Sequence, residues 1–462
     1  MLRVALGVSL VAALCAGLLA WGLRPPSLAV PDTGLVLHDV TLVEPGRGNR
    51  PGRMLTVTGD RITGIGDAQG ESGPYSGTFV LPGLVDLHVH HPPPWALGER
   101  ELYALLFLAH GVTSVRDTGS VLGDLFTFRE RIAAGELPGP RIRTCGPVLA
   151  GPGALWPGAR EIADAASGRR AVEALFRAGA DCIKIYNEVP DDAIAAIREA
   201  AAERSLPLVA HVPRGVSILQ LEGAEVQHLM GLGPRWWRVD PDRLAWYART
   251  SAQQRIAHTP TLVAFARSAL LSEPGALESD PLAGLLPRHY REILWNPERN
   301  PLASELAPSW DAPAATRVAV MKETLRALRE AGVTILAGSD TGNPMVVPGA
   351  ALHEELRQLV DAGIPLEEVW VTATRRAGEV LGVEGLGTLA EGAPADLLVF
   401  REDPTGDLTA LAGLEAVVAA GRLYPREVLD SALERQRAHF ERPWIAGPSG
   451  LVARAVTALN TP

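Results

Sequence analysis

Cysteine is scarce in this chain, which limits the ways in which the fold can be held together. Only three cysteines, Cys15, Cys145 and Cys182, occur among 462 residues. Three are too few for the disulfide framework of a small secreted domain, and Cys15 lies inside a hydrophobic N-terminal run. We therefore predict that the cysteines are free, buried thiols and that a large apolar core stabilises the protein.

A basic cluster is also missing. The chain has 43 Lys and Arg against 53 Asp and Glu, a formal net charge of −10. No basic region offsets this charge, so nucleic acid is excluded as a partner. Internal repeats and low-complexity tracts are absent as well. The composition is that of a globular protein, with 47% hydrophobic residues. The chain is long enough for one large domain with a small companion. The expected partner is a small-molecule substrate, and self-association into a homo-oligomer is left open.

The N-terminus differs from the rest of the chain. Residues 4–23 are almost continuously apolar, and Arg24 and two prolines end the run. A run of this length can span a bilayer, while Ser27 and Ala29 have the spacing of a signal-peptide cleavage site. We predict that residues 1–30 are a signal peptide or a transmembrane anchor. The protein is then exported, periplasmic or extracellular, and either tethered to the membrane or released.

A short apolar strand that ends in histidines is the most informative stretch. It runs from Leu84 to His90 in "LPGLVDLHVHHPPP", and three prolines prevent its continuation. Side chains alternate across a strand, so His88 and His90 project from one face, about 7 Å apart along the chain. His91 points the other way. This spacing allows His88 and His90 to bind one ion.

Strand-like and helix-like segments alternate after this strand, which is typical of parallel βα units. Seven further strand candidates begin at Val112, Pro140, Ala180, Leu206, Ala224, Thr259 and Val333. The span 83–383 is close to the roughly 250 residues of a (β/α)8 TIM barrel. The predicted fold class is therefore α/β, with this span as the barrel of a metal-dependent hydrolase. The surplus lies in 267–313, whose Pro, Trp and Arg content favours a lid or substrate loop.

The two segments that flank the predicted barrel share a different sequence pattern. Residues 31–82 and 384–426 contain short β-like runs separated by Gly, Pro and Asp turns. Neither flank is large enough for a stable sheet of its own. We expect both to pair in one small β-sandwich built from the two chain ends. The remainder, 427–462, is a C-terminal tail whose first part, to about Arg442, is predicted to be helical and charged.

Metal-ligand side chains follow the predicted barrel strands. The C-terminal strand ends form the active face of such a barrel, so residues placed there meet at one mouth. These residues are His88, His90, Lys184, His211, His228 and Asp340. Imidazoles and carboxylates suit Zn²⁺ or a similar first-row ion, and neutral histidine ligands leave the ion able to acidify a bound water.

Lys184 is the least ordinary of these residues. It lies between Ile183 and Ile185, where an unpaired ammonium is costly. Burial lowers the pKa of a lysine, and a neutral amine can react with CO₂ to give a carbamate that bridges two metals. The alternative is a lysine that reaches the barrel mouth or pairs with Asp181. The histidines nearby favour the ligand interpretation.

Taken together, these motifs resemble the amidohydrolase superfamily, and within it the metal-dependent amidohydrolases similar to imidazolonepropionase and the Xaa-Pro or Xaa-Arg dipeptidases. The resemblance rests on segments that follow the family's order: "LPGLVDLHVH", "GVTSVRDTG", "GADCIKIY", "LPLVAHVP", "AEVQHLM", "GVTILAGSDT", "ALHEELRQLVDAGI" and "GTLAEGAPADLLVF". It covers most of the chain after residue 35. Imidazolonepropionase itself is less similar, because its equivalent of Lys184 is not a bridging ligand.

The resemblance implies a binuclear centre of two divalent ions, most simply zinc. The buried ion would be bound by His88, His90, Lys184 and Asp340. The outer ion would be bound by His211, His228 and Lys184, which is N6-carboxylated by CO₂. A hydroxide that bridges the ions would attack a substrate carbonyl, and Asp340 would accept its proton and pass it to the leaving nitrogen.

The implied function is hydrolysis of an amide (C–N) bond in a small substrate such as a dipeptide or an N-acyl amino acid. A cyclic amide, a carbamate or a lactone is the alternative substrate. A non-catalytic, membrane-tethered binding protein is disfavoured, because all six expected ligands are present.

Substrate-binding residues are harder to identify from the sequence. His353 starts a helical run after the last barrel strand, Tyr186 follows Lys184, and Arg214 could bind a substrate carboxylate. A surface histidine and a core tyrosine are the structural alternatives for the first two. Arg116 and Asp117 end the second strand, where a structural ion pair is favoured over substrate contact.

Overall fold

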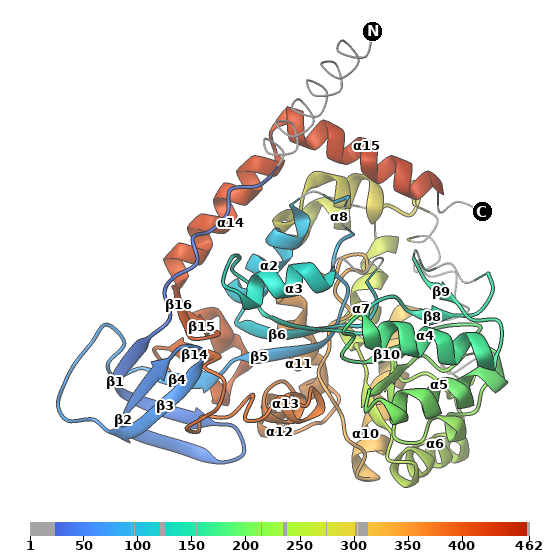
Figure 1. Ribbon diagram of the computed structural model, residues 1–462, viewed down its shortest axis with the longest axis horizontal. Helices are drawn as coiled ribbons and strands as arrows, with labels where there is room; N and C mark the ends of the chain where they lie inside the picture. Colours follow the sequence, from blue (N-terminus) through green and yellow to red (C-terminus); the bar gives the residue numbers. More distant parts are fainter. Residues whose placement is uncertain are drawn as a thin grey trace.

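The computed structural model describes residues 24–459, apart from positions 94, 97, 121–124, 154, 155, 157, 214, 234–237, 274, 301, 302 and 304–312. Two parallel sheets, one mixed sheet and the helices around them make up the molecule (Figure 1). In this part of the chain no helix is both long and apolar enough to cross a membrane. The predicted signal peptide or anchor lies mostly in residues 1–23, outside the described residues.

The parallel strands appear in the predicted order. One sheet has the order β5-β6-β7 and the other the order β13-β12-β11-β10-β8-β9. Their bounds are β5 (Leu84–Val89), β6 (Val112–Asp117), β7 (Arg141–Thr144), β8 (Leu149–Ala150), β9 (Arg160–Glu161), β10 (Ile183–Ile185), β11 (Leu208–Ala210), β12 (Glu225–Gln227) and β13 (Ala257–Thr259). Each of the first six predicted strand regions therefore contains a strand. The seventh prediction, from Thr259 to Phe265, is wrong for most of its length, because β13 ends at Thr259 and the helix α7 (Leu262–Ser268) begins three residues later.

The eighth predicted strand, from Val333, is an extended segment that bonds to both sheets. His258 of β13 donates its backbone N–H to Thr334 O (2.9 Å) and accepts from Leu336 N (2.9 Å). On the other side, Leu87 of β5 donates to Ala337 O at 3.1 Å. Segment 334–341 thus places its residues beside β13 and β5 together.

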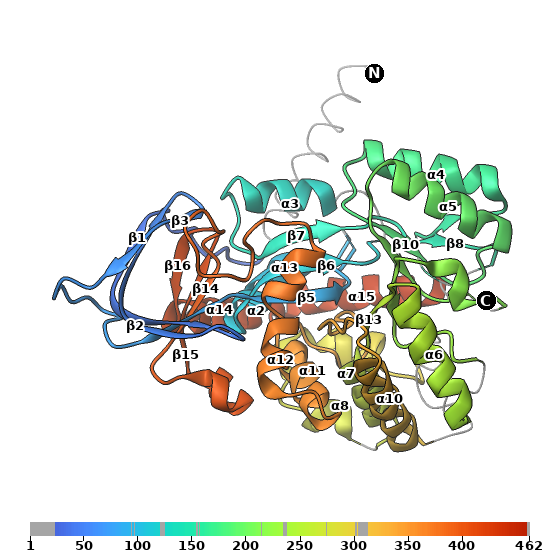
Figure 2. The ribbon, with the colours of Figure 1, turned by 90° about the horizontal axis from the view of Figure 1, so that it is seen from below.

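Helices cover the parallel strands on both sides. In the view of Figure 2 the strands lie between α3, α4 and α5 on one side and α7, α10, α11 and α12 on the other. The helices are α2 (Glu99–Ala109), α3 (Leu125–Ala133), α4 (Ala165–Arg177), α5 (Asp191–Glu203), α6 (Pro241–Gln253), α7 (Leu262–Ser268), α10 (Ala314–Glu330), α11 (Ala350–Asp361), α12 (Leu366–Thr372) and α13 (Arg375–Val380). The start of α4 follows from its sequence, because Asp164 and Ser167 form a capping box.

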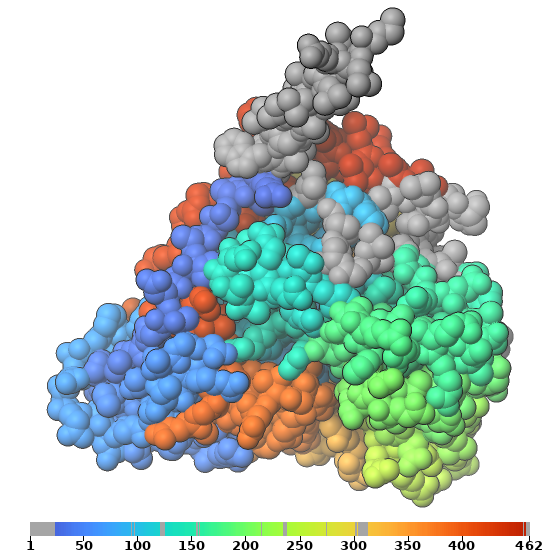
Figure 3. Space-filling view, viewed as in Figure 1, coloured from blue at the N-terminus to red at the C-terminus, as the bar shows by residue number. Residues whose placement is uncertain are grey.

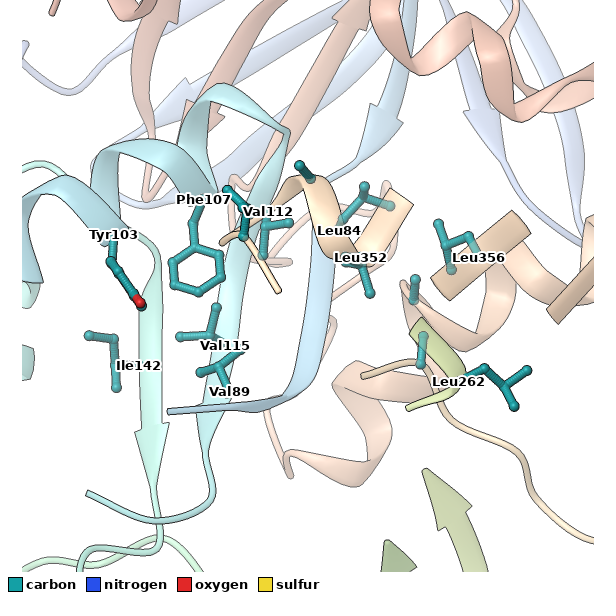
Figure 4. Close-up of a cluster of buried hydrophobic side chains, with 14 of the residues drawn as sticks. Leu84, Val89, Tyr103, Phe107, Val112, Val115, Ile142, Leu262, Leu352 and Leu356 are labelled. Atoms are coloured by element: carbon teal, nitrogen blue, oxygen red, sulfur yellow. The ribbon is translucent and has the colours of Figure 1, made fainter. Parts of the chain in front are cut away.

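The core lies where these helices meet the strands. Tyr103 and Phe107 of α2 pack against Val112 and Val115 of β6, and Val89 of β5 joins them (Figure 4). The strands β5 and β6 are buried along their whole length. Both faces of these strands are therefore covered, as in other parallel sheets between helices.

Both chain ends contribute to a single seven-stranded sheet with the order β16-β15-β14-β4-β1-β2-β3. Its strands are β1 (Leu35–Glu44), β2 (Gly48–Thr58), β3 (Arg61–Asp67), β4 (Phe79–Pro82), β14 (Leu397–Phe400), β15 (Leu414–Ala419) and β16 (Arg422–Pro425). The antiparallel pairing of β4 with β14 joins the two ends. In the space-filling view, the orange surface around α12 and α13 lies between this blue sheet and the green α5–α6 region (Figure 3). The two-layered sandwich stays a prediction.

The prediction of free thiols is wrong for two of the three cysteines. Cys145 and Cys182 form a disulfide, with their Cα atoms 4.4 Å apart. Cys145 follows β7 and Cys182 precedes β10, and a backbone hydrogen bond from Asp181 N to Thr144 O (2.8 Å) holds these two segments side by side. The sulfur atoms are therefore brought together by neighbouring parallel segments. Cys15 lies outside the described residues.

The C-terminal tail is helical, as predicted, and longer than expected. Helix α14 (Arg426–Phe440) is followed by α15 (Pro443–Leu459), which the sequence did not indicate. The described parts of 267–313 form short helical turns rather than an open loop. These are η3 (Ala269–Ser272), α8 (Ala276–Ser279), η4 (Ala283–Leu285) and the single-turn π-helix η5 (Tyr290–Leu294).

Candidate metal centre

Three ligand-type side chains meet at the C-terminal end of β5. One ligand atom each from His88, His90 and Asp340 lies within 4.8 Å of the others. Asp340 Oδ1 is 3.2 Å from Nε2 of His88 and 3.2 Å from Nε2 of His90. Atoms bound tetrahedrally to one zinc ion lie roughly 3.3 Å apart, since each Zn–N bond is about 2.0–2.1 Å. The three side chains therefore already have the spacing of a shared coordination sphere.

His211 and His228 extend this group. The imidazole centroid of His228 lies 4.8 Å from that of His88 and 4.7 Å from that of His211. Nδ1 of His228 is also 3.7 Å from Asp340 Oδ2. The four histidines, predicted from three different strands, are thus in one contiguous cluster.

Each of these four imidazoles has a polar partner at Nδ1. The pairs are His88 with Gln227 Oε1, His90 with Gly119 O (3.3 Å), His211 with Asn187 Oδ1 (3.2 Å) and His228 with Thr261 Oγ1 (2.6 Å). An acceptor at Nδ1 holds the proton on that nitrogen and leaves Nε2 with a free lone pair. The cluster therefore has the arrangement of metal-binding histidines and their supporting residues.

Lys184 is buried beside the histidines. Its side chain is 1% exposed, and its Nζ has no hydrogen-bond partner in the part of the chain that the structure describes. Burial lowers the pKa of Lys184 to about 7, against the opposing charge of Asp340. The alternative pairing with Asp181 is wrong, because Asp181 bonds to Arg129 (2.8 Å) and Arg143 (2.7 Å).

Electrostatics favours the metal-binding protonation states. Burial lowers the pKa of His88 to about 4 and holds the pKa values of His211 and His228 well below the usual value. Burial alone would raise the pKa of Asp340, but its interactions with His88 and His228 outweigh burial and hold that pKa well below the usual value. The site therefore combines neutral imidazoles with an ionised carboxylate.

Among the described residues, the ligand-type nitrogens Nε2 of His88 and Nζ of Lys184 are buried without a hydrogen-bond partner. Buried polar atoms are nearly always satisfied, so each of these requires an explanation. A divalent ion would satisfy Nε2 of His88, and carboxylation would turn Lys184 into an oxygen ligand. The residues present fit a metal centre.

Backbone geometry at the site is unusual. His228 and Asp340 have φ values of 58° and 61°, in the left-handed region that is rare for residues other than glycine. Gly338 allows segment 334–341 to approach β5 closely. A Cβ atom on Gly338 would lie 2.6 Å from Thr259 Cγ2 and 2.9 Å from His88 Cβ. The two strand ends that carry His88 and Asp340 can therefore lie in direct contact.

Aromatic rings lie on two of the histidines. The ring of Tyr186 is 4.4 Å from that of His211, and the ring of Trp156 is 4.7 Å from that of His90. Trp156 and Tyr186 are 5.4 Å from each other. Tyr186 was a candidate from the sequence, whereas Trp156 was not, because it lies in the connection after β8 with no motif around it.

Other candidate residues are placed differently. His353 lies in α11, where its Nε2 donates to the backbone oxygen of His110 (2.7 Å). Within the described residues its recorded contacts join α11 to the end of α2 and do not reach the histidine cluster. Arg214 lies outside the described residues. Its predicted role and the substrate contact of His353 stay predictions.

The second strand carries the predicted structural ion pair, with different partners. Arg116 pairs with Glu225 of β12. Asp117 accepts hydrogen bonds from the backbone N–H (2.9 Å) and Nδ1 (3.0 Å) of His91. His91 therefore points away from the cluster, as the alternation along the strand predicts.

Comparison with known proteins identifies the family. The amidohydrolase family profile matches residues 79–423, a range that contains all six candidate ligands. A search of curated proteins finds no match. A solved bottromycin amidohydrolase is 26% identical, with a TM-score of 0.71 over 88% of this chain and 90% of that chain.

Two further solved structures have similar folds. A prolidase candidate from Bifidobacterium longum is 25% identical, with a TM-score of 0.63 over 88% of this chain and 99% of that chain. A Xaa-Pro dipeptidase with methionine bound in its active site is 20% identical, with a TM-score of 0.62 over 85% and 100%, and shows likeness of fold alone. Because the family match spans most of the sequence, the chain belongs to the amidohydrolase family.

Proposed function

We propose that the protein is a binuclear, metal-dependent hydrolase that cleaves an amide (C–N) bond in a small substrate, a dipeptide or an N-acyl amino acid. One observation carries this proposal: four imidazoles, a carboxylate and a buried lysine amine converge at the ends of the parallel strands. Membership of the amidohydrolase family supports amide hydrolysis in general.

The ligands divide into two sets. His88, His90, Lys184 and Asp340 would bind a buried ion, and Lys184, His211 and His228 would bind an outer one. Imidazole and carboxylate ligands suit zinc. When bound, such ions lower the pKa of a water and polarise a carbonyl oxygen.

Lys184 would join the two sets as a carbamate. The lone pair of its neutral amine attacks the carbon of CO₂, an N–C bond forms, and one proton leaves the nitrogen for solvent. The product has one negative charge and two oxygens, one for each ion. Burial of Lys184 and the absence of a partner at its Nζ support this step, because both favour the neutral, reactive amine.

Asp340 would move the proton during hydrolysis. Its carboxylate is ionised and lies beside His88 and His90, where the attacking water has to be placed. It accepts a proton from this water and delivers it to the nitrogen of the breaking C–N bond. Trp156 and Tyr186 flank the same cluster and would exclude bulk water from it. Arg214 would bind the carboxylate of a dipeptide.

The architecture we propose for this function is a closed (β/α)8 barrel with a small β-sandwich. Support for closure comes from the bonds of segment 334–341 to both β13 and β5, and from the bond between Asp181 N and Thr144 O. Support for the sandwich comes from the seven-stranded sheet shared by both chain ends. We also propose export, since a disulfide such as Cys145–Cys182 persists mainly in oxidising compartments.

Metal analysis and a substrate panel test this function. The purified wild type, in metal-replete buffer with bicarbonate, should contain two divalent ions per chain. His211→Ala should contain one, and the matched control His38→Ala, a β1 residue in an ion pair with Glu71, should retain two. Dipeptides and N-acyl amino acids should be hydrolysed.

Hydrolysis of only cyclic amides, carbamates or lactones would replace the proposed substrate class. Tight binding of substrates without turnover of any of them, or the absence of bound metal, would overturn the enzymatic function.

A further inference from the structure

A buried glutamine lies directly behind one of the candidate ligands. Gln227 of β12 is 0% exposed, and its Oε1 contacts Nδ1 of His88. Its other amide atom, Nε2, donates to Glu225 Oε1 at 2.8 Å. Gln227 therefore connects a metal-site imidazole to a carboxylate deeper between the strands.

Glu225 is held in place by three donors. Arg116 bonds to both of its oxygens, at 2.8 Å for Oε2, and Thr259 Oγ1 donates to Oε1. Burial alone would raise the pKa of Glu225, but the Arg116 guanidinium outweighs burial and the net effect lowers that pKa. Glu225 is therefore a carboxylate. The same Arg116 donates its Nε to the backbone oxygen of Leu87 (2.9 Å), the residue before His88.

These contacts determine how the amide is oriented. An ionised carboxylate only accepts hydrogen bonds, so Gln227 has to offer its NH₂ group to Glu225 and its oxygen to His88. A carbonyl oxygen also only accepts, so the proton of His88 lies on Nδ1. Nε2 lies 3.2 Å from Asp340 Oδ1 and has no hydrogen-bond partner among the described residues, so its lone pair is free.

We propose that Gln227 is a positioning residue that holds His88 in the Nδ1-protonated tautomer and so presents Nε2 to the buried ion. The inference rests on the proposed metal centre and deepens it. Because Arg116 and Glu225 neutralise each other, the network orients His88 without adding a net charge next to it. Gln227 would thus determine geometry and metal affinity rather than the charge of the site.

His228 offers a matched comparison. Its Nδ1 contacts Thr261 Oγ1 (2.6 Å), and that hydroxyl donates to Pro260 O (2.7 Å), so Thr261 accepts from His228. His228 is assigned to the outer ion. Removal of the Thr261 hydroxyl should therefore affect a different metal from removal of the Gln227 amide.

Two substitutions at Gln227 separate positioning from packing. Gln227→Met keeps the length of the side chain and removes both hydrogen bonds. Gln227→Glu also keeps the length of the side chain and retains an acceptor oxygen for Nδ1 of His88.

The experiment has two readouts, the tautomer of His88 by ¹⁵N NMR of the metal-free protein and the dissociation constants of both zinc ions by chelator competition. In Gln227→Met we expect a mixture of His88 tautomers and binding of the buried ion weakened roughly 10- to 100-fold. In Gln227→Glu the tautomer and the affinity should stay close to wild type. Thr261→Val should weaken only the outer ion and leave the His88 tautomer unchanged.

Wild-type tautomer and affinity in folded Gln227→Met would overturn the proposal. If Gln227→Met does not fold, Gln227→Glu decides, because loss of the single tautomer in this folded variant would also contradict it. The tautomer readout needs no bound metal. Failure of the wild type to bind zinc would therefore overturn the binuclear function, while the role of Gln227 at His88 would still be measured.

Discussion

At the scale of single residues, Lys184 determines whether two ions can be bridged. In Lys184→Met the methionine side chain is similar in length to lysine but offers no oxygen ligand and no negative charge. We therefore expect the variant to lose both metals and its activity to fall by several orders of magnitude. Lys184→Ala leaves a gap that acetate or propionate can enter. Metal analysis and the initial hydrolysis rate, with and without these acids, provide the measurement.

The rescue separates a bridging ligand from a packing residue. Partial recovery of the hydrolysis rate and of bound metal in Lys184→Ala with acetate supports a bridging carbamate. Guanidinium is the control, because a cation cannot replace the carboxylate and should restore neither. A Lys184→Met protein with two bound metals and a nearly normal rate would contradict the binuclear centre.

Glu355 of α11 predicts a pH dependence of stability. It is 0% exposed, its Oε2 accepts from Val263 N (2.8 Å), and its Oε1 has no partner. Burial raises the pKa of Glu355 from 4.5 to about 8, and the charges of Asp86 and Asp340 add to this. The folded protein therefore keeps a proton that the unfolded chain has already lost. The contribution of this proton to the free energy of unfolding is complete below pH 4.5 and disappears as the pH rises to 8.

Glu355→Gln keeps the acceptor for Val263 and removes the titration. We expect the variant to match the wild type near pH 4.5 and to exceed it at pH 8 by more than about 1 kcal/mol in the free energy of unfolding, since one pKa unit corresponds to about 1.4 kcal/mol. Urea unfolding of both proteins at several pH values measures the difference. Parallel pH profiles would show that Glu355 is ionised in the folded protein.

The sequence predicted the ligands better than the residues that support them. Alternation along a strand and the shared end of parallel strands were enough to bring His88, His90 and Asp340 together. Gln227 and Thr261 were missed, because their role depends on which neighbouring strand each side chain faces. Nor does sequence pattern predict a left-handed φ at a residue such as Asp340, because tertiary contacts impose that geometry.

At the scale of secondary-structure elements, the disulfide shows what residue counting overlooks. A chain with too few cysteines for a disulfide framework can still form one disulfide between neighbouring strands. Cys145 and Cys182 lie at β7 and β10, which the predicted barrel order already placed next to each other. Strand order was therefore the signal that could have identified the pair.

The double substitution of Cys145→Ser with Cys182→Ser should destabilise the protein. The bond closes a loop with a sequence separation of 37 residues, for which chain entropy gives about 4 kcal/mol. Guanidinium unfolding at matched pH measures this loss. Thiol titration of the denatured, unreduced wild type should find one reactive cysteine if Cys15 is retained and none if residues 1–30 are cleaved, and reactive thiols at Cys145 and Cys182 would contradict the bond.

The first six predicted strand regions overlap strands of the structure, whereas the region from Thr259 is mostly the helix α7 and the C-terminal helix α15 was missed. Pro448 lies inside α15, and a proline normally ends a helix because it lacks an N–H and collides with the preceding turn. The two-residue strands β8 and β9 were missed for another reason. Segments that short have no periodicity from which to recognise them.

At the scale of the whole molecule, export remains a prediction from the N-terminal apolar run. A fusion of residues 1–40 to a reporter that is active only outside the cytoplasm should show activity. The same fusion with two residues of the run changed to arginine is the control and should be inactive. Activity confined to a cytoplasmic reporter would exclude export.

The predicted boundaries at residues 83, 384 and 427 also stay predictions, although the pairing of both chain ends is present in the seven-stranded sheet. Composition and turn residues indicated that neither flank could form a sheet alone. They could not specify the strand order or the parallel pairing of β1 with β4, because register depends on side-chain packing between distant segments.

The pairing of β4 with β14 has a consequence for biosynthesis. Phe79 lies opposite Phe400, about 320 residues later in the chain, so this contact forms only after long-range loop closure. While the ribosome is still making the C-terminal part, β4 has no β14 to pair with, and the strand edge stays open. The nascent polypeptide therefore cannot complete its seven-stranded sheet until synthesis is nearly finished.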